Sequence, residues 1–403
     1  MERPDTLFTI GWLIDGSGGP IRRNICMTVQ NGRIQHLREM EHSDWDHPAL
    51  VDLSDSTLVP HLVDSHVHLF MSGTDDTDTR ERQLTADYHT ARRVIGGHLQ
   101  SHARCGVMAV RDGGDRSGHS LRFAIESGDT VGVVMRTAGK AWRQIGRYGS
   151  LIGRPPPDGT TLAEAILAET TRADHVKIVN SGLNSLIEFG KTTAPQFTLS
   201  EMTQAVAASA RRGLKVMVHA NGALPVEIAV NAGCASIEHG FFMGTDNLVK
   251  LTEHGVFWIP TAVTMKAYSE MLRPEDPRRE GALRNMEHQF DQIGQARKAG
   301  VRIAAGSDAG SLGVHHGPGV IHEMKLLYEA GLSLGEVVQC ASSNGAALLN
   351  LKKKGVVAAG QKADFVTLKG APSELFEQLE QNPRIWVEGM RVDSYQDDPK
   401  KTS

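Results

Sequence analysis

One segment of the chain leads from an apolar pair directly into two closely spaced histidines: Val59-Pro60-His61-Leu62-Val63-Asp64-Ser65-His66-Val67-His68. Leu62-Val63 predicts the start of a buried strand that runs on into the histidines. Side chains alternate between the two faces of a strand, so His66 and His68 point to the same side. Both imidazoles can therefore reach one cation, although an isolated pair with this spacing also occurs by chance.

Seven further apolar runs follow, and helical stretches such as residues 198–212 and 285–300 lie between them. Continuous apolar runs are typical of buried parallel strands, and repeated strand–helix units imply a parallel sheet. Eight such units favour an α/β fold of the (β/α)8 TIM-barrel type over residues 61–351. Besides the first strand, the runs are residues 109–110, 131–135, 176–179, 215–218, 236–237, 256–259 and 301–305.

Three of these strands end in side chains that bind metals, namely His219, His239 and Asp308. Barrel enzymes build their active sites at the C-terminal ends of the strands, so these groups can meet His66 and His68. Taken singly, a strand-end histidine is commonly a hydrogen-bonded core residue, and a Ser-Asp pair is commonly a helix N-cap. The five together, in chain order, indicate a metal site.

Lys177 lies inside the apolar run His175-Val176-Lys177-Ile178-Val179, where a lysine is rarely buried without a partner. It could extend its amine to water or pair with a carboxylate. Burial also lowers a lysine pKa, and a neutral amine can add CO2 to become a carbamate. We expect the carbamate, because an anionic ligand with two oxygens can bridge two cations.

The two ends of the chain are predicted to pair with each other. The Asn31-Gly32 dipeptide between two β-type runs is a strong hairpin signal, and residues 355–357, 363–368 and 384–389 are strand candidates near the other end. We therefore expect a small β-sandwich domain formed by residues 1–60 and 352–396. Residues 397–403 are predicted to be a polar tail.

Composition excludes several classes of protein. The net charge of −4 over 403 residues lacks the basic character of nucleic-acid binders. The 4 cysteines form no CxxC pair, which argues against a disulfide framework or a thiolate zinc site. The sequence shows no long apolar run and no leader pattern. We expect a cytoplasmic protein, outside the membrane, with a small-molecule substrate, and a homo-oligomer.

With these motifs the sequence resembles the amidohydrolase superfamily, and within it the prolidase-like and imidazolonepropionase-like enzymes. The resemblance spans nearly the whole chain. The motifs that carry it are residues 59–68, 106–114, 176–178, 218–220, 237–240, 306–310 and 360–365. One position departs from the family, which usually has Pro-Gly where this chain has Pro60-His61. Because His61 lies near the strand start, we expect it to change packing and not chemistry.

The resemblance implies a role for each ligand. His66 and His68 would bind the more buried of two divalent metal ions, with zinc the default, and carboxylated Lys177 would bridge both ions. His219 and His239 would bind the more exposed ion. Asp308 would bind the buried ion and exchange protons with a bridging hydroxide, which would attack an amide carbonyl.

Substrate contacts are expected from the loops that follow the strands. Arg143, Arg147 and Tyr148 lie in one such loop, and a guanidinium suits a substrate carboxylate. His315 and His316 lie in the glycine-rich loop of residues 313–319, where His316 is the candidate contact. Arg143 and Arg147 could equally be surface residues of a mobile loop, and the two histidines could belong to a solvated one.

The expected activity is hydrolysis of an amide (C–N) bond in a small carboxylate-bearing substrate, such as a dipeptide or an N-acyl amino acid. A mononuclear deaminase or cyclic amidine hydrolase of the imidazolonepropionase type is the alternative. It predicts one metal ion per chain and no need for Lys177. A non-catalytic relative is a third possibility, which the complete set of ligands disfavours.

Overall fold

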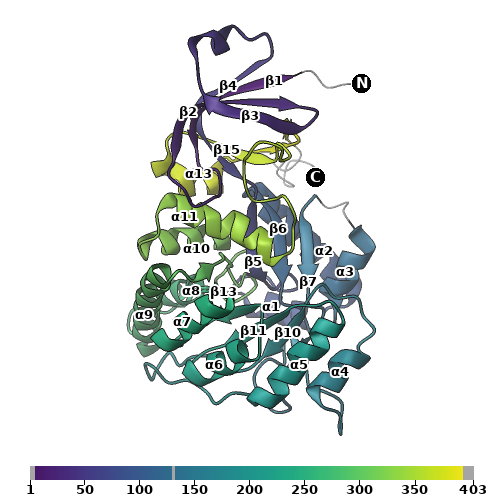
Figure 1. Ribbon diagram of the computed structural model, residues 1–403. Coiled ribbons are helices and arrows are strands. Elements are labelled where there is room, and N and C mark those ends of the chain that lie inside the picture. Colours follow the sequence, from purple (N-terminus) through teal and green to yellow (C-terminus); the bar gives the residue numbers. More distant parts are fainter. Residues whose placement is uncertain (1–4, 129–131, 394–403) are drawn as a thin grey trace.

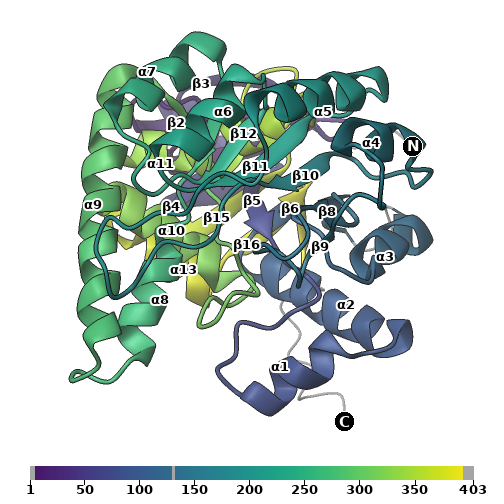
Figure 2. The same ribbon diagram turned by 90° about the horizontal axis from the view of Figure 1, so that it is seen from below.

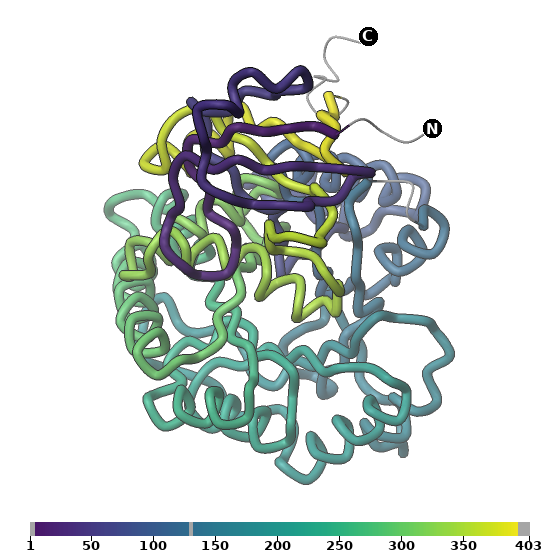
Figure 3. Tube along the Cα trace, turned by 45° about the horizontal axis from the view of Figure 1, so that its top comes forward, coloured from purple at the N-terminus to yellow at the C-terminus, as the bar shows by residue number. Residues whose placement is uncertain are grey.

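The computed structural model describes residues 5–128 and 132–393. A sheet built from both ends of the chain lies above a larger region of alternating strands and helices (Figure 1). The first and last parts of the chain run side by side at one end of the molecule (Figure 3). The predicted polar tail, residues 397–403, lies outside the described residues.

The terminal sheet has seven strands in the order β17-β16-β15-β4-β1-β2-β3. Antiparallel pairing of β4 with β15 joins the two ends of the chain, with Pro60 opposite Phe365. The side chains of Phe8, Phe365 and Trp386 pack edge-on or stacked in its core. The strands are β1 (Thr6–Leu13), β2 (Arg22–Gln30), β3 (Arg33–Glu39), β4 (Leu50–Pro60), β15 (Phe365–Lys369), β16 (Arg384–Val387) and β17 (Met390–Val392).

The structure confirms the hairpin predicted at Asn31-Gly32, where β2 turns into β3 and both turn residues have positive φ. It also confirms that the two ends pair. The strand predicted at residues 355–357 is wrong, because Gly355 adopts a φ of +84° and Val357 donates one backbone hydrogen bond to Asp15 instead of joining a ladder. The described strands of this region belong to a single sheet, so the β-sandwich stays a prediction.

The parallel strands form a three-stranded sheet, β5-β6-β7, and a seven-stranded sheet, β14-β13-β12-β11-β10-β8-β9. Backbone hydrogen bonds link the two sheets, from Ser65 to Ala305 (2.9 Å) and from Asp174 to Thr137 (2.9 Å). The strands are β5 (Leu62–Val67), β6 (Val107–Asp112), β7 (Val134–Thr137), β8 (Ala141–Trp142), β9 (Gly153–Arg154), β10 (Val176–Val179), β11 (Val216–Ala220), β12 (Ser236–His239), β13 (Phe257–Ile259) and β14 (Arg302–Ile303).

All eight predicted strand positions carry a strand, which is consistent with the expected TIM barrel. The third, β7, begins at Val134, and residue 131 of the prediction lies outside the described part of the chain. The eighth, β14, is only two residues long, and Asp308 lies in the loop that follows it. The short strands β8 and β9 were not predicted, since two-residue strands leave no periodic signal.

Helices lie around the parallel strands when the molecule is seen from below (Figure 2). The helix predicted at 198–212 is α5, and a capping box between Thr198 and Glu201 starts it. The helix predicted at 285–300 begins earlier, at Pro277, because Asp276 caps it and proline suits the first helical position. The helices are α1 (Thr77–Leu84), α2 (Tyr88–Arg104), α3 (His119–Ser127), α4 (Leu162–Ala168), α5 (Leu199–Arg211), α6 (Ala223–Asn231), α7 (Thr245–His254), α8 (Val263–Met271), α9 (Pro277–Ala299), α10 (Pro318–Glu329), α11 (Leu334–Gln339), α12 (Gly345–Leu348) and α13 (Leu375–Gln381).

His61 links the terminal sheet to the parallel strands. Its Nε2 lies 2.9 Å from the carbonyl oxygen of Trp386, which can only accept, so the imidazole donates this hydrogen bond. The contact fits the packing role expected for this position. No helix within the described residues is long and apolar enough to cross a membrane.

Candidate metal centre

A cavity of about 390 Å³ opens at the C-terminal ends of the parallel strands. The six predicted metal ligands all line it, although the first and last are more than 240 positions apart in the sequence. These six are His66, His68, Lys177, His219, His239 and Asp308. The strands therefore bring together the side chains that the sequence analysis selected.

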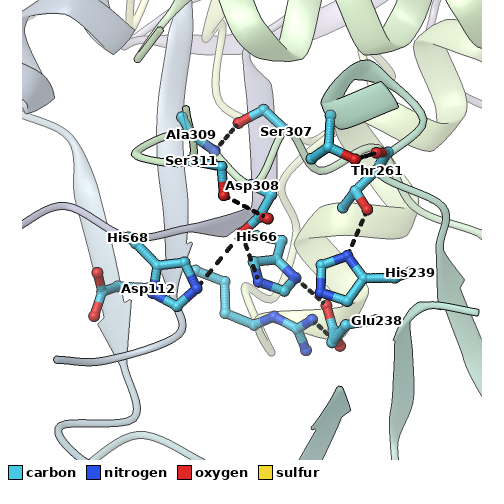
Figure 4. A network of polar contacts seen from close by, with 12 residues as sticks. His66, His68, Asp112, Glu238, His239, Thr261, Ser307, Asp308, Ala309 and Ser311 are labelled. Carbon is cyan, nitrogen blue, oxygen red and sulfur yellow. Dashed lines mark hydrogen bonds and ion pairs between the residues drawn. The ribbon is translucent and has the colours of Figure 1, made fainter. Parts of the chain in front are cut away.

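His66, His68 and Asp308 form the tightest group, with ligand atoms within 4.8 Å of one another. Nδ1 of His66 lies 2.7 Å from Oε2 of Glu238, and Nδ1 of His68 lies 3.1 Å from the carbonyl oxygen of Gly114. Carboxylate and carbonyl oxygens accept, so each Nδ1 carries the proton. Each Nε2 then presents a lone pair near Oδ1 of Asp308, at 3.3 and 3.5 Å (Figure 4).

His239 and His219 are fixed in the same manner. Nδ1 of His239 lies 2.6 Å from the hydroxyl of Thr261, and that hydroxyl donates to the carbonyl of Pro260 at 2.8 Å. The hydroxyl therefore accepts from His239, whose Nε2 keeps its lone pair. Nε2 of His219 lies 3.2 Å from the carbonyl of Gly182, which leaves the lone pair on Nδ1.

The four imidazoles form a continuous row along the cavity. Ring centroids are 5.4 Å apart from His68 to His66, 5.0 Å from His66 to His239, and 4.6 Å from His239 to His219. Burial lowers the pKa of His68 to about 4 and that of His219 to about 3, and it also lowers the pKa values of His66 and His239 well below the usual value. All four rings are therefore neutral at pH 7, the form that binds a metal ion.

Lys177 and Asp308 complete the group. Burial, opposed by the charges of Glu238 and Asp308, lowers the pKa of Lys177 to about 8. Within residues 5–128 and 132–393, its amine is in no hydrogen bond or contact ion pair. Burial raises the pKa of Asp308 to about 7, against the hydrogen bond from Ser311 and the charge of Lys177.

Two of the ligands have left-handed backbone: His239, the last residue of β12, and Asp308, in the loop after β14. His239 has a φ of +70° and Asp308 a φ of +58°. The carbonyl of His239 accepts from Trp258 (3.0 Å) and Gln289 (2.7 Å), and the amide of Asp308 donates to the carbonyl of His66 (2.7 Å). These bonds hold a conformation that residues other than glycine rarely adopt, and such strain is concentrated at functional sites.

The donor set fits a divalent metal ion. Nε2 of the fully buried His66 has no hydrogen-bond partner, although a carboxylate oxygen lies close by. Two nitrogen lone pairs that face a carboxylate oxygen repel it unless a cation or a proton lies between them. Imidazole nitrogens and carboxylate oxygens are ligands that zinc prefers.

Of the four residues predicted to contact substrate, one lines the cavity and three do not. Tyr148 lines the cavity with its ring 5.3 Å from that of His219. Arg143 and Arg147 do not line it, and their guanidinium groups donate to backbone carbonyls of the surrounding loops. His316 is buried behind the cavity, where it donates to the carbonyl of Met71 and stacks on His98. A substrate role for these residues stays a prediction, and the geometry favours Tyr148.

Several residues that support the ligands were not selected from the sequence. Glu238 receives hydrogen bonds from His66, from Arg111 (2.7 Å) and from Ser236. Asp64 accepts from the backbone of Ser307 at 2.9 Å. A carboxylate and a guanidinium inside apolar strands were the available signal, because such charges are rarely buried unless they are paired.

Known proteins share this architecture. The Amidohydrolase family model matches residues 57–392. An ochratoxinase of Aspergillus niger is 24% identical over 431 residues, covering 96% of this chain and 86% of the relative. An imidazolonepropionase of Cupriavidus pinatubonensis is 26% identical over 399 residues, covering 91% and 88%.

A solved structure agrees with these sequence matches. The crystal structure of a Xaa-Pro dipeptidase with bound methionine in the active site has a TM-score of 0.77 and 27% identity, covering 96% of this chain and 100% of that chain. All six candidate ligands lie within the residues that the family model matches. The chain belongs to the amidohydrolase family.

Proposed function

We propose that the protein is a metal-dependent hydrolase that cleaves the amide bond of a small carboxylate-bearing substrate, such as a dipeptide or an N-acyl amino acid. The observation that carries this proposal is the convergence of all six candidate ligands on one cavity. Membership of the amidohydrolase family and similarity to a dipeptidase and an ochratoxinase support metal-dependent amide hydrolysis. The cavity volume of about 390 Å³ suits a small molecule.

The architecture belongs to the same proposal. We infer that the parallel strands close into a (β/α)8 barrel over residues 61–351. The flanking segments, 1–60 and 352–396, would form a β-sandwich around the core that contains Phe8, Phe365 and Trp386. Hydrogen bonds between the two parallel sheets support closure.

The ligands divide into two groups. His66, His68 and Asp308 would hold one divalent ion, and His219 and His239 a second, with carboxylated Lys177 between them. Zinc is the default for this donor set. When bound, such ions acidify water and polarise a carbonyl oxygen.

The side chains of the protein have their own tasks in the reaction. Oδ2 of Asp308 accepts a hydrogen bond from the hydroxyl of Ser311 at 2.8 Å, which fixes the carboxylate in the cavity. Asp308 takes up a proton from the water that attacks the amide carbonyl and returns it to the leaving nitrogen. Tyr148 covers the cavity beside His219 and helps to exclude bulk water.

The decisive experiment is a hydrolysis screen with metal-replete protein. Dipeptides, N-acyl amino acids, lactones and phosphotriesters are compared, and amine or acid release is measured. We expect hydrolysis of an amide in the first two classes, and loss of it in Lys177→Ala. Lys215→Ala, an exposed lysine before β11, is the matched control and should keep activity. Activity on none of the amides would contradict the proposal.

One observation favours the mononuclear alternative, a deaminase or cyclic amidine hydrolase. Among the described residues, His66, His68 and Asp308 are the one group of three or more histidine, cysteine or acidic side chains whose ligand atoms all lie within 4.8 Å of one another, and three ligands suffice for one ion. Metal content per chain separates the two functions. One ion per chain, with activity retained in Lys177→Ala, would establish the alternative.

A further inference from the structure

The cavity contains one arginine, Arg80, that the sequence analysis did not select. It enters from α1, the first helix after the histidine strand, and it is the only arginine among the described residues that line the cavity. The other charged lining residues are Lys177 and Asp308, both assigned to the metal centre. Arg80 is therefore the charged lining residue that is not assigned to the metal centre, and its guanidinium can bind a ligand.

Hydrogen bonds fix the guanidinium of Arg80 between two loops. Its Nη1 donates to the carbonyl of Ser72 at 2.6 Å and to that of Gly310 at 3.2 Å. Ser72 follows His68 by four residues, and Gly310 follows Asp308 by two. The position of the guanidinium is thus tied to the same loops that carry metal ligands.

The remaining donors of Arg80 face no carboxylate. Its hydrogen bonds within the described residues all use Nη1 and reach only backbone carbonyls, and no ion pair there includes it. Three N–H groups, on Nε and Nη2, are left for a ligand. A half-buried guanidinium without a counter-ion is the group that a carboxylate binds through two parallel hydrogen bonds.

Tyr268 lines the same cavity and is close enough to both Arg80 and Asp308 for their charges to act on it. It lines the cavity from α8, and burial together with the charge of Asp308 raises its pKa, whereas Arg80 lowers it. The neutral hydroxyl can donate to an anion held by the guanidinium. Arg80 and Tyr268 thus form a polar end of the cavity beside Asp308.

Much of the remaining lining is apolar, although Ser150, Asn184, Asn221, Thr264 and Ser311 also line the cavity. Its larger apolar members include Phe70, Leu151, Ile152, Leu183, Leu186 and Met265. Such a surface contributes binding energy only to a ligand that covers it with apolar atoms. A substrate that fits the cavity therefore carries both a carboxylate and a bulky apolar group.

We propose that Arg80 binds the substrate carboxylate and that the apolar part of the lining selects amides with a bulky apolar substituent. This inference rests on the proposed function, since it names the substrate class of the same site. Arg80 then contacts the substrate as well as the backbone carbonyls of Ser72 and Gly310.

The test uses matched substrates in matched variants. N-Benzoyl-L-phenylalanine is compared with its carboxamide, and release of benzoate is measured for wild type, Arg80→Gln, Arg80→Lys and Arg82→Gln. Arg82 lies exposed on the same helix and is the control for substitution there. In wild type and Arg82→Gln we expect kcat/KM to favour the carboxylate by about 10- to 100-fold.

In Arg80→Gln that preference should fall to near unity, mainly through KM, and Arg80→Lys should restore part of it. The ratio of kcat/KM for the carboxylate to that for the carboxamide, taken within each variant, does not change when part of the protein is unfolded. An equal loss for both substrates would show that Arg80 only ties the loops, and would overturn the inference. Loss of the preference in Arg147→Gln instead would assign the contact to Arg147.

A binding measurement separates this inference from the proposed function. Calorimetric titration of chelator-treated protein with N-benzoyl-L-phenylalanine needs no turnover. We expect binding about 10- to 100-fold weaker in Arg80→Gln than in wild type. Hydrolysis of other amides without any preference for a carboxylate would overturn the inference alone, whereas inactivity toward every amide would remove the proposed function.

Discussion

At the scale of single residues, the charge pair behind the metal ligands sets their chemistry. Glu238 is fully buried and lies between the guanidinium of Arg111 (2.7 Å) and Nδ1 of His66 (2.7 Å). The carboxylate therefore balances Arg111 and also determines which nitrogen of His66 is free to bind a metal. Carboxylates that orient a ligating histidine in this way raise metal affinity.

Glu238→Gln should weaken both roles. Removing one charge of a buried pair leaves Arg111 uncompensated, so we expect the free energy of unfolding to fall by about 3 kcal/mol. Metal affinity should fall by about 10- to 100-fold. Urea unfolding and metal content after dialysis measure the two effects. Glu253→Gln, on the exposed side of α7, is the control, and metal retention equal to that of wild type would contradict the assignment.

At the scale of elements, the loop after β14 approaches the loop after β5 so closely that it depends on glycine. Gly310 has a φ of +99°, and a Cβ there would lie 2.5 Å from the carbonyl oxygen of His68 and 2.9 Å from that of Met71. Both neighbours are backbone atoms that cannot move without displacing His68. The loop conformation therefore places Asp308 and His68 relative to each other.

Gly310→Ala should lower stability and metal content together. Gly331 is the matched control, because its φ is +102° but a Cβ added there would have no atom of the described residues within 4 Å. Gly331→Ala should show the backbone strain alone, about 1–2 kcal/mol. Gly310→Ala should lose more, as well as bound metal, in urea unfolding and metal analysis. Equal losses in the two variants would refute the steric argument.

A buried carboxyl group also controls the start of α8. Oε2 of Glu323, on α10, accepts a hydrogen bond from the amide of Val263 at 2.8 Å, and the side chain is fully buried. Burial raises the pKa of Glu323 from 4.5 to about 8. The folded state therefore binds the proton of Glu323 more tightly than the unfolded state does. The resulting contribution to the free energy of unfolding is complete below about pH 4.5 and is lost as pH rises through 8.

Glu323→Gln keeps an acceptor for Val263 and removes the ionisation. We therefore expect the variant to gain stability relative to wild type between pH 5 and 9, by about 1–3 kcal/mol at the upper end. Near pH 4.5 the difference between the two proteins should be smallest. Glu329→Gln, exposed on the same helix, should show no such pH dependence. Chemical unfolding across this pH range measures the difference, and a constant difference would contradict the pKa shift.

At the scale of the whole molecule, the metal centre joins segments from nearly the whole length of the parallel region. His66 comes from β5, His219 and His239 from β11 and β12, and Asp308 from the loop after β14. A bound ion therefore connects elements that are distant in sequence and adds its binding free energy to folding.

Removal of metal should lower the thermal stability of the whole chain. At a free metal concentration of 100 times Kd, binding adds about 2.7 kcal/mol to the free energy of unfolding. We expect a chelator to lower the unfolding temperature and added zinc to restore it. In His66→Ala the chelator should have a much smaller effect. An unfolding temperature that is the same with and without chelator would show that no ion contributes to the fold.

The sequence by itself determined the ligand types, their order and the strands that carry them. Alternation of apolar runs with helical stretches is a local property, and so is the position of His219 or Asp308 at the end of such a run. The hairpin signal at Asn31-Gly32 is also local and was found in place, as was the helix expected at residues 198–212. These features follow from backbone geometry within a few residues, which the sequence encodes directly.

Only the tertiary structure decided what lies behind and opposite the ligands. The pairing of Glu238 with Arg111 spans 127 positions, and the contact of Arg80 with Gly310 spans 230. The strand expected at residues 355–357 failed for the same reason, since its conformation follows from contact with the distant N-terminal segment. Such contacts depend on how elements pack in space, and no periodic pattern within one segment records them.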